Sequence, residues 1–191
     1  MHCYSAEAAA GAKTSNLSLG SSLFGMIPDQ VSDGSTGNDA CGHRRWLLYS
    51  KAYRMGVGSV NSAGAVCVLP DHSTADRDTS RFHGIVPEYF AYPFKGYVPY
   101  PLIYSKWSFS VPGTADFSAA YVSAVSDSKK INCSVVSRTD NFGDPTIVWT
   151  VNEAMYKYAD KKIAVTVGNV KVNGQMKSYS YSFTVIDPYA H

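Results

Sequence analysis

The chain has 191 residues, enough for one large domain or two small ones, and 45% of them are hydrophobic. Only 17% are charged, a balance that excludes an intrinsically disordered chain. The formal net charge of +2 comes from scattered basic residues with one short cluster at 43–45, so a nucleic-acid partner is not expected. The 14 tyrosines among many serines favour β-rich, extracellular material.

We expect neither a targeting segment nor a membrane span in this sequence. The first five residues lack the basic and apolar regions of a signal peptide, so the signal of a secreted protein would lie upstream of Met1. No window approaches the roughly 18 apolar residues that a membrane-spanning helix needs. The cysteines have no C-x-x-C spacing, which argues against a zinc ribbon and leaves three disulfide pairings, or none, open. They are Cys3, Cys41, Cys67 and Cys133.

The N-terminal half predicts short elements joined by loops. Residues 5–14 are rich in alanine and begin with a serine and an early glutamate, which favours a short helix. Residues 20–38 are rich in glycine, serine, aspartate and proline, which predicts a loop with one apolar island at 23–27. A short helix and then the two strands of an antiparallel hairpin are expected at residues 44–49, 55–60 and 63–69.

The C-terminal half changes to a period of two. Residues 85–102 are rich in proline and aromatic residues, which predicts an extended linker at the end of a first domain over 1–102. Alternating segments and a turn signal at Asn173–Gly174 then predict an immunoglobulin-like β-sandwich over 103–191. The expected inward positions are Trp107, Phe109, Val111, Ile131, Cys133, Val135, Ile147, Trp149, Val151, Ile163, Val165, Val167, Tyr179, Tyr181, Phe183 and Val185.

A polar cluster followed by apolar residues marks the centre of the first domain. Gly42 precedes His43, Arg44 and Arg45, and Trp46 and two leucines follow directly. Burial of such large apolar side chains would hold the polar cluster in place. The segment is therefore either part of the core with a capping histidine or a functional site.

Two motifs resemble those of the CAP superfamily, which includes cysteine-rich secretory proteins, antigen 5 and plant pathogenesis-related class one proteins. Gly42–His43, with Leu47–Leu48 and then Gly56–Gly58 after it, is similar to the motif around the family's second histidine. Residues 14–20 are similar to its Gly-Glu-Asn-[Ile/Leu]-Ala-x-Gly motif, in the family's order. The arginine-rich variant resembles bacterial members. The resemblance implies an α+β fold, with the later part of a CAP α/β/α sandwich before the immunoglobulin-like β-sandwich.

The resemblance also implies a cleft lined by two histidines and two acids. His43 corresponds to the second histidine, and Ser15 stands where the first acid is expected. His2 is the only candidate for the first histidine, whose usual place is upstream of this chain. The second acid is either Asp29 or Asp33. The implied ligand-binding residues are Ser15, Asn16, Asp33, His43, Arg44 and Arg45.

No cofactor is expected, and a divalent metal is not favoured. A metal bound by imidazoles needs several ligands, and His43 is the one histidine that the motifs assign. The positive charges of Arg44 and Arg45 are expected to lower the pKa of His43, which also opposes cation binding. A metal, if bound, would lie at His43.

These features predict a secreted, non-catalytic binding or interaction module, located outside the cell or on its surface. Its partner would be a small apolar ligand, a glycan or a surface partner, and the oligomeric state stays open. The alternative is a hydrolase with His43 as general base and Ser15 or Ser18 as nucleophile, or a divalent-metal-dependent activity at His43. No Gly-x-Ser-x-Gly elbow is present.

The same segment also has structural interpretations. Arg44 and Arg45 are expected to be buried partners of a carboxylate, because the planar guanidinium binds a carboxylate through two hydrogen bonds. A cysteine at the position of Cys41 forms a disulfide in plant relatives, and Cys3 is a possible partner, although a buried free thiol is the alternative. The candidate carboxylates for the two arginines are those of Asp29, Asp33 and Asp39.

Overall fold

The chain folds into two compact units. Unit 1 comprises Met1–Asp33 and Gly42–Val86, and unit 2 comprises Gly34–Cys41 and Pro87–His191. The main division between the units therefore lies before Pro87, whereas the sequence analysis placed the domain boundary near residue 103. The loop Gly34–Cys41, from the N-terminal half of the chain, also belongs to unit 2. The computed structural model describes residues 5–21, 23–52, 54–69 and 86–190.

Strands dominate the described residues, which contain three α-helices and thirteen strands. The helices have 8, 10 and 6 residues, so that each is at most about 15 Å long, too short and too few to cover both faces of a sheet. The predicted α+β class with a partial α/β/α sandwich is therefore wrong, and the fold is mostly β. No helix in the described ranges is long and apolar enough to cross a membrane.

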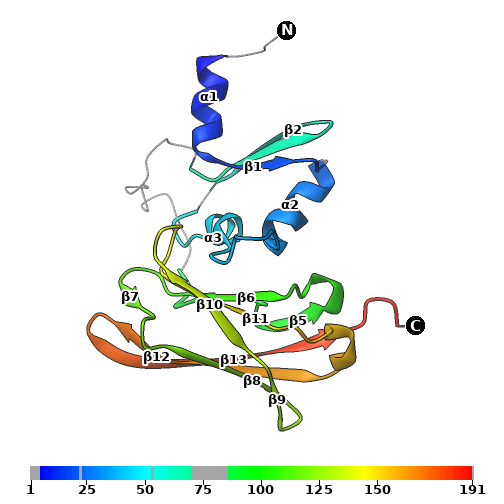
Figure 1. The fold of residues 1–191 in the computed structure, drawn as a ribbon, viewed down its shortest axis with the longest axis vertical. Coiled ribbons are helices and arrows are strands. Elements are labelled where there is room, and N and C mark those ends of the chain that lie inside the picture. The colour runs from blue at the N-terminus through cyan, green and yellow to red at the C-terminus, as the bar shows by residue number, and fades with distance from the viewer. Residues whose placement is uncertain (1–4, 22, 53, 70–85, 191) are drawn as a thin grey trace. The chain divides into compact units, whose positions relative to one another are not determined.

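Unit 1 is built on a three-stranded antiparallel sheet with the order β1-β3-β2 (Figure 1). β2 and β3 form the predicted hairpin, which is confirmed. Leu17, Leu19 and Val60 lie on one face and are 51%, 88% and 70% exposed, so the described residues leave this face open. That open face is the finding that overturns the sandwich of helices around the sheet. The strands are β1 Ser15–Leu19, β2 Gly56–Val60 and β3 Ala63–Cys67.

Two of the helices of unit 1 were predicted from the sequence. α1 spans Ala6–Lys13, and the Ser5 side chain accepts a hydrogen bond from the backbone N–H of Ala8 at 3.0 Å, which caps the helix as expected. α3 spans Gly42–Leu47, close to the predicted residues 44–49. Both predictions are confirmed within two or three residues at each end, the usual uncertainty of helix boundaries.

α2 spans Leu23–Ser32, so the loop predicted over residues 20–38 is wrong in this part. Pro28 lies inside the helix, and proline counts against a helix in any sequence-based prediction. The helix forms because Met26 and Gln30, one turn apart, are both buried on one face. Met26 packs with Val66 in the small apolar core of unit 1.

Unit 2 holds two sheets, which Figure 1 shows as two layers. The first has the order β10-β11-β6-β4 and the second the order β5-β13-β12-β8-β9, with β7 paired to β12. The segment predicted as an extended linker contributes β4, β5 and the short 3-10 helix η2, so only part of it is irregular. The elements are β4 Phe90–Tyr92, β5 Gly96–Pro99, η2 Tyr100–Leu102, β6 Lys106–Ser110, β7 Ala115–Asp116, β8 Tyr121–Ser126, β9 Lys129–Ile131, β10 Ser134–Thr139, β11 Thr146–Thr150, η3 Met155–Tyr158, β12 Lys162–Val172 and β13 Gln175–Ile186.

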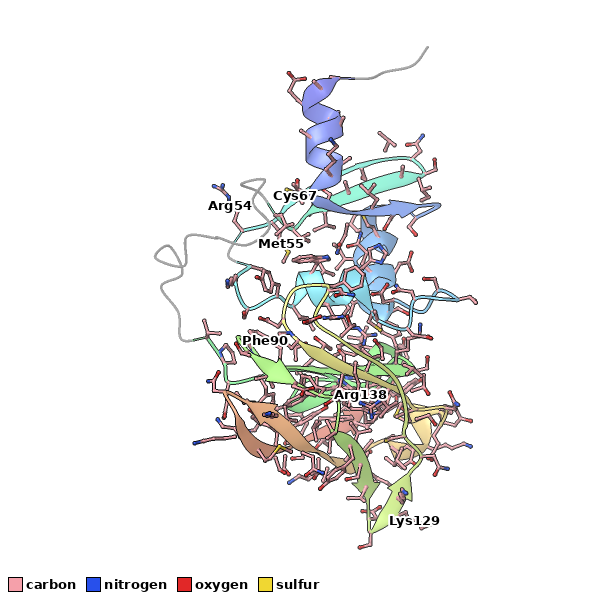
Figure 2. All side chains as sticks on the ribbon, turned by 60° about the vertical axis from the view of Figure 1, so that its left-hand side comes forward. Arg54, Met55, Cys67, Phe90, Lys129 and Arg138 are labelled. Carbon is pink, nitrogen blue, oxygen red and sulfur yellow. The ribbon has the colours of Figure 1, made fainter. Side chains whose placement is uncertain are left out.

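One apolar cluster joins the two sheets of unit 2. Four large aromatic side chains of this cluster are each at most 1% exposed, so the prediction that they point inward is confirmed. They are Trp107, Phe109, Trp149 and Phe183. Side chains fill the space between the sheets in Figure 2, which labels Lys129 at the start of β9. The likeness to immunoglobulin modules stays a prediction.

The hairpin between β12 and β13 was also predicted. Asn173 and Gly174 have φ angles of 50° and 82°, the left-handed conformation that this pair of residues favours in a two-residue turn. β5 pairs with β13 in parallel, whereas β4 pairs antiparallel with β6, so the two short strands before η2 join different sheets.

Candidate functional site

His43 and Asp33 form a hydrogen-bonded pair in unit 1. The Nδ1 atom of His43 lies 2.8 Å from the Oδ1 atom of Asp33. The Asp33 side chain is 2% exposed and that of His43 is 41% exposed, so a buried carboxylate orients a ring that a ligand can reach. Of the two candidate acids, Asp33 contacts His43, whereas Asp29 is exposed and accepts a hydrogen bond from Ser21.

The start of α3 fixes the Asp33 carboxylate. Its Oδ2 atom accepts the backbone N–H of Arg44 at 3.2 Å. The first amides of a helix have no partner within the helix, and a carboxylate there is stabilised by hydrogen bonding and by the helix dipole. The same carboxylate therefore caps α3 and holds the imidazole that α3 carries.

Arg44 joins the end of α2 to α3. Its side chain is fully buried, and its Nε and Nη2 atoms donate to the backbone carbonyls of Val31 and Ser32, the latter at 2.8 Å. These carbonyls belong to the last turn of α2, where no helical amide is available to them. The predicted burial of Arg44 is confirmed, and so is that of Arg45, which is 3% exposed.

A buried pair of amides links β1 to the backbone of His43. Asn16 and Gln30 are 4% and 2% exposed. The Nδ2 atom of Asn16 donates to Gln30 Oε1 at 3.2 Å and to the His43 carbonyl at 2.9 Å, and Gln30 Nε2 donates to Ser18 Oγ at 3.1 Å. β1, α2 and α3 are thus joined by side-chain hydrogen bonds around the residue that carries the exposed ring.

The pKa of His43 is raised above its ordinary value, mainly because the ring hydrogen-bonds to Asp33 and secondarily because of the charge of that carboxylate. Partial burial of the ring lowers the pKa but does not outweigh these effects. The prediction that Arg44 and Arg45 lower the pKa of His43 is therefore wrong. The sequence did not reveal that the nearest charge is the carboxylate of Asp33 and that the Arg44 guanidinium is directed to the carbonyls of α2.

Neither candidate nucleophile is bonded to the imidazole. Ser15 donates its hydroxyl to the carbonyl of Gly11 at 2.7 Å, and Ser18 accepts from Gln30. Successive side chains of a strand point to opposite faces, so Ser15 lies on the sheet face opposite to Asn16. Within the described ranges, no hydroxyl or thiol is hydrogen-bonded to the His43 ring.

Asp39, another candidate partner of the arginines, lies in the loop of unit 2. Its Oδ1 atom is 3.7 Å from the Nζ atom of Lys106, which also donates to the carbonyl of Asn38 at 2.8 Å. Lys106 is only 8% exposed, so it holds this loop against β6 within unit 2. A charged partner of Arg45 stays a prediction.

The described part of the chain holds no group of three or more histidine, cysteine, aspartate or glutamate side chains placed to bind a metal ion.

His2 and Cys3 lie outside the described residues, so the predicted first histidine and the disulfide to Cys41 stay predictions. Cys67 and Cys133 form no disulfide among the described residues, and burial raises the pKa of the Cys133 thiol to about 11. That thiol is therefore protonated and poorly reactive at neutral pH.

Gln30 is the residue of this site that the sequence analysis missed. It lies in α2, which was predicted to be a loop, and it contacts both Asn16 and Ser18. A spacing signal was present, because Met26, Gln30 and Asp33 recur at intervals of four and three residues, as on one face of a helix. Two of these three residues are polar, which hid the pattern.

No protein-family model matches this chain, and no curated protein matches it. The likeness to the CAP superfamily rests on two short motifs and stays a prediction.

Proposed function

We propose that this chain is a secreted, CAP-like protein of the extracellular space or cell surface, and that the His43 region is a non-catalytic binding site. The two motifs in the family's order support the CAP assignment, and the tyrosine-rich, weakly charged composition supports the location. The observation that carries the binding function is the half-exposed His43 ring, held by the buried Asp33.

The chemistry of the pair fits recognition of a hydrogen-bond acceptor. With Nδ1 bonded to a carboxylate and the pKa raised, the ring takes up a proton more readily, and a protonated imidazole is a donor at both nitrogens. A glycan oxygen, a carboxylate or a phosphate would accept the second hydrogen bond. The buried contacts of Asn16 and Arg44 hold the backbone of α3, so little conformational entropy would be lost on binding.

The open face of the sheet in unit 1 supports an interaction role as well. Leu17, Leu19 and Val60 are more than half exposed, and exposed apolar side chains gathered on one face mark interaction surfaces. A ligand with an apolar body, or a protein partner, would find contact area in this unit. The exposed apolar face favours such a partner whether or not His43 is protonated.

A hydrolase is the second candidate, and the His43–Asp33 pair is the observation that favours it. A carboxylate bonded to Nδ1 is the arrangement that orients a general base in nucleophilic catalysis. Against it, the ring has no hydroxyl or thiol partner among the described residues, and Ser15 lies on the opposite face of the sheet from Asn16. Binding is therefore the better supported of the two.

A binding screen of the full chain against glycans, lipids and peptides tests the proposal, with His43→Gln, Asp33→Asn and Asp29→Asn as variants. We expect a ligand whose affinity falls in the first two variants and is unchanged in the third, because Asp29 is an exposed carboxylate that does not contact His43. No binding in the whole screen would contradict the binding site. Hydrolysis of esters or peptides by the parent but not by His43→Gln would establish the hydrolase instead.

A further inference from the structure

Unit 2 contains a cavity of about 370 Å³ between η2 and η3. The two short 3-10 helices contact each other, and the gold and green segments that contain them meet at one end of the sheets in Figure 1. The volume lies within the range of pockets that hold small ligands, roughly 300 to 1,000 Å³. Its lining includes Tyr100, Tyr104 and Tyr156, with Glu153, Ile103 and Met155.

The ring of Tyr100 stands at a steep angle to two other tyrosine rings. The ring centroids of Tyr100 and Tyr156 are 6.5 Å apart with 72° between the ring planes, and Tyr189 packs on Tyr100 at 6.2 Å and 68°. Tyr156 is 60% exposed, so this wall of the cavity is open to solvent. Rings at such angles form the walls of a cage rather than the flat platform on which a sugar ring would stack.

The charge of the cavity is negative. Glu153 is in the lining, and its carboxylate accepts the backbone N–H of Asn132 at 3.2 Å and the hydroxyl of Tyr158. Tyr100 also lies close enough to Asp187 for that charge to raise its pKa, after the larger effect of burial. No lysine, arginine or histidine from the described ranges lines the cavity.

We propose that this cavity binds an organic cation, specifically a quaternary or fully methylated ammonium group. Such a cation is attracted to the faces of aromatic rings, and several rings together form the cage by which methylated ammonium groups are recognised. The rings of Tyr100 and Tyr156 supply the faces, and Glu153 supplies the opposite charge. The methyl groups of the ligand would contact Ile103 and Met155.

The test compares choline with its neutral isostere 3,3-dimethylbutan-1-ol by calorimetric titration of the full chain. We expect choline to bind and the isostere to bind about tenfold more weakly or not at all, since only the charge differs. Equal affinity for both compounds would overturn the proposal in favour of a merely apolar pocket. No binding of choline, or binding of glucose in its place, would overturn it as well.

Variants of Tyr156 test separately whether the face of the aromatic ring attracts the cation. Tyr156→Leu should weaken choline binding about tenfold, and Tyr156→Phe should preserve it, because the ring face and not the hydroxyl carries the attraction. Tyr97→Leu is the matched control, since Tyr97 is 72% exposed on β5 and is not part of the lining. An equal loss in Tyr156→Phe and Tyr156→Leu would contradict the cage. Tyr156 is exposed, so its variants are expected to fold, which thermal unfolding verifies.

The same cation occurs free, on a lipid headgroup and on methylated lysine. Titration with choline, with phosphatidylcholine vesicles and with a trimethyl-lysine peptide separates these sources. A preference for one of the three identifies the natural ligand, and each preference supports the proposed chemistry. The proposal would be overturned if the protein bound only vesicles and bound vesicles without choline headgroups equally well.

Discussion

The two units of this protein differ in what their interiors are made of. Unit 2 encloses one large apolar cluster in which aromatic side chains such as Trp107, Trp149 and Phe183 are almost completely buried. Among the described residues of unit 1, four belong to the buried apolar core, Met26 among them, and six polar or charged residues are buried as well. They are Asn16, Gln30, Asp33, Arg44, Arg45 and Ser50.

This difference shows how each unit is specified. Apolar burial depends mainly on area and tolerates changes of shape, so a core such as that of unit 2 is robust. A buried polar network is stable only when each group keeps its hydrogen-bond partner, and it then fixes one arrangement. Unit 2 is suited to carry stability, and unit 1 is suited to hold His43 in one place.

Trp149→Ala in unit 2 should have the largest effect. Removing this fully buried ring leaves a cavity, and the free energy of unfolding should fall by about 3 to 5 kcal/mol, as measured by urea denaturation. Trp149→Phe should cost less than Trp149→Ala, because it leaves a smaller cavity and because the indole N–H that it removes has no hydrogen-bond partner among the described residues. If Trp149→Ala costs less than 1 kcal/mol, the apolar core does not carry the stability of unit 2.

Met26→Ala should destabilise unit 1 by about 2 to 3 kcal/mol, because the core there is small and its other members are few. Hydrogen exchange of the β1 and β3 amides measures the effect within the unit. The amides of β12 should keep the protection of the parent protein. Equal loss of protection in both units would show that they unfold together, and the comparison between them would fail.

Gln30→Ala should cost about 1 to 2 kcal/mol, since it leaves the buried amide of Asn16 without one of its partners. Hydrogen exchange of the β1 and β3 amides measures this loss of stability. Gln30→Glu keeps an oxygen that can accept from Asn16 and removes the donor to Ser18, so it tests whether the contact with Asn16 alone maintains stability. A neutral result for Gln30→Ala would mean that the hydrogen bonds of Gln30 with Asn16 and Ser18 contribute nothing to the stability of unit 1.

The elements of unit 2 could be predicted because their signal is local. Alternation of apolar and polar residues marked β6, β11, β12 and β13, and Asn173–Gly174 marked the turn between the last two. The alternation fails as a guide to burial in β6, where Ser108 and Ser110 are buried together with the apolar residues, and in β11, where Thr146 and Val148 are buried as well. The sequence does not show that both faces of these two strands are covered.

The site in unit 1 could be predicted only in part. Gly42–His43 pointed to the correct place, but the partner of His43 depends on the backbone of Asp33, which has a φ of 48° at the end of α2. Because α2 contains Pro28, the sequence predicted a loop there, and the choice between Asp29 and Asp33 could not be made. The direction of the pKa shift was missed for the same reason, since it depends on which carboxylate the ring contacts.

The smallest predicted effect is the pH dependence of the His43–Asp33 pair. The folded pKa of His43 is raised, so this pair stabilises the fold fully below the ordinary histidine pKa of about 6.5 and loses its effect as the pH rises through the raised value. The ring is 41% exposed, so solvent screening keeps the contribution to stability small.

Titration of the His43 ring by NMR tests the central claim, which is that the buried Asp33 carboxylate holds a ring that a ligand can reach. We predict a pKa above 6.5 in the parent protein, a lower value in Asp33→Asn, and no change in Asp29→Asn. A parent pKa at or below 6.5 that Asp33→Asn leaves unchanged would contradict the account.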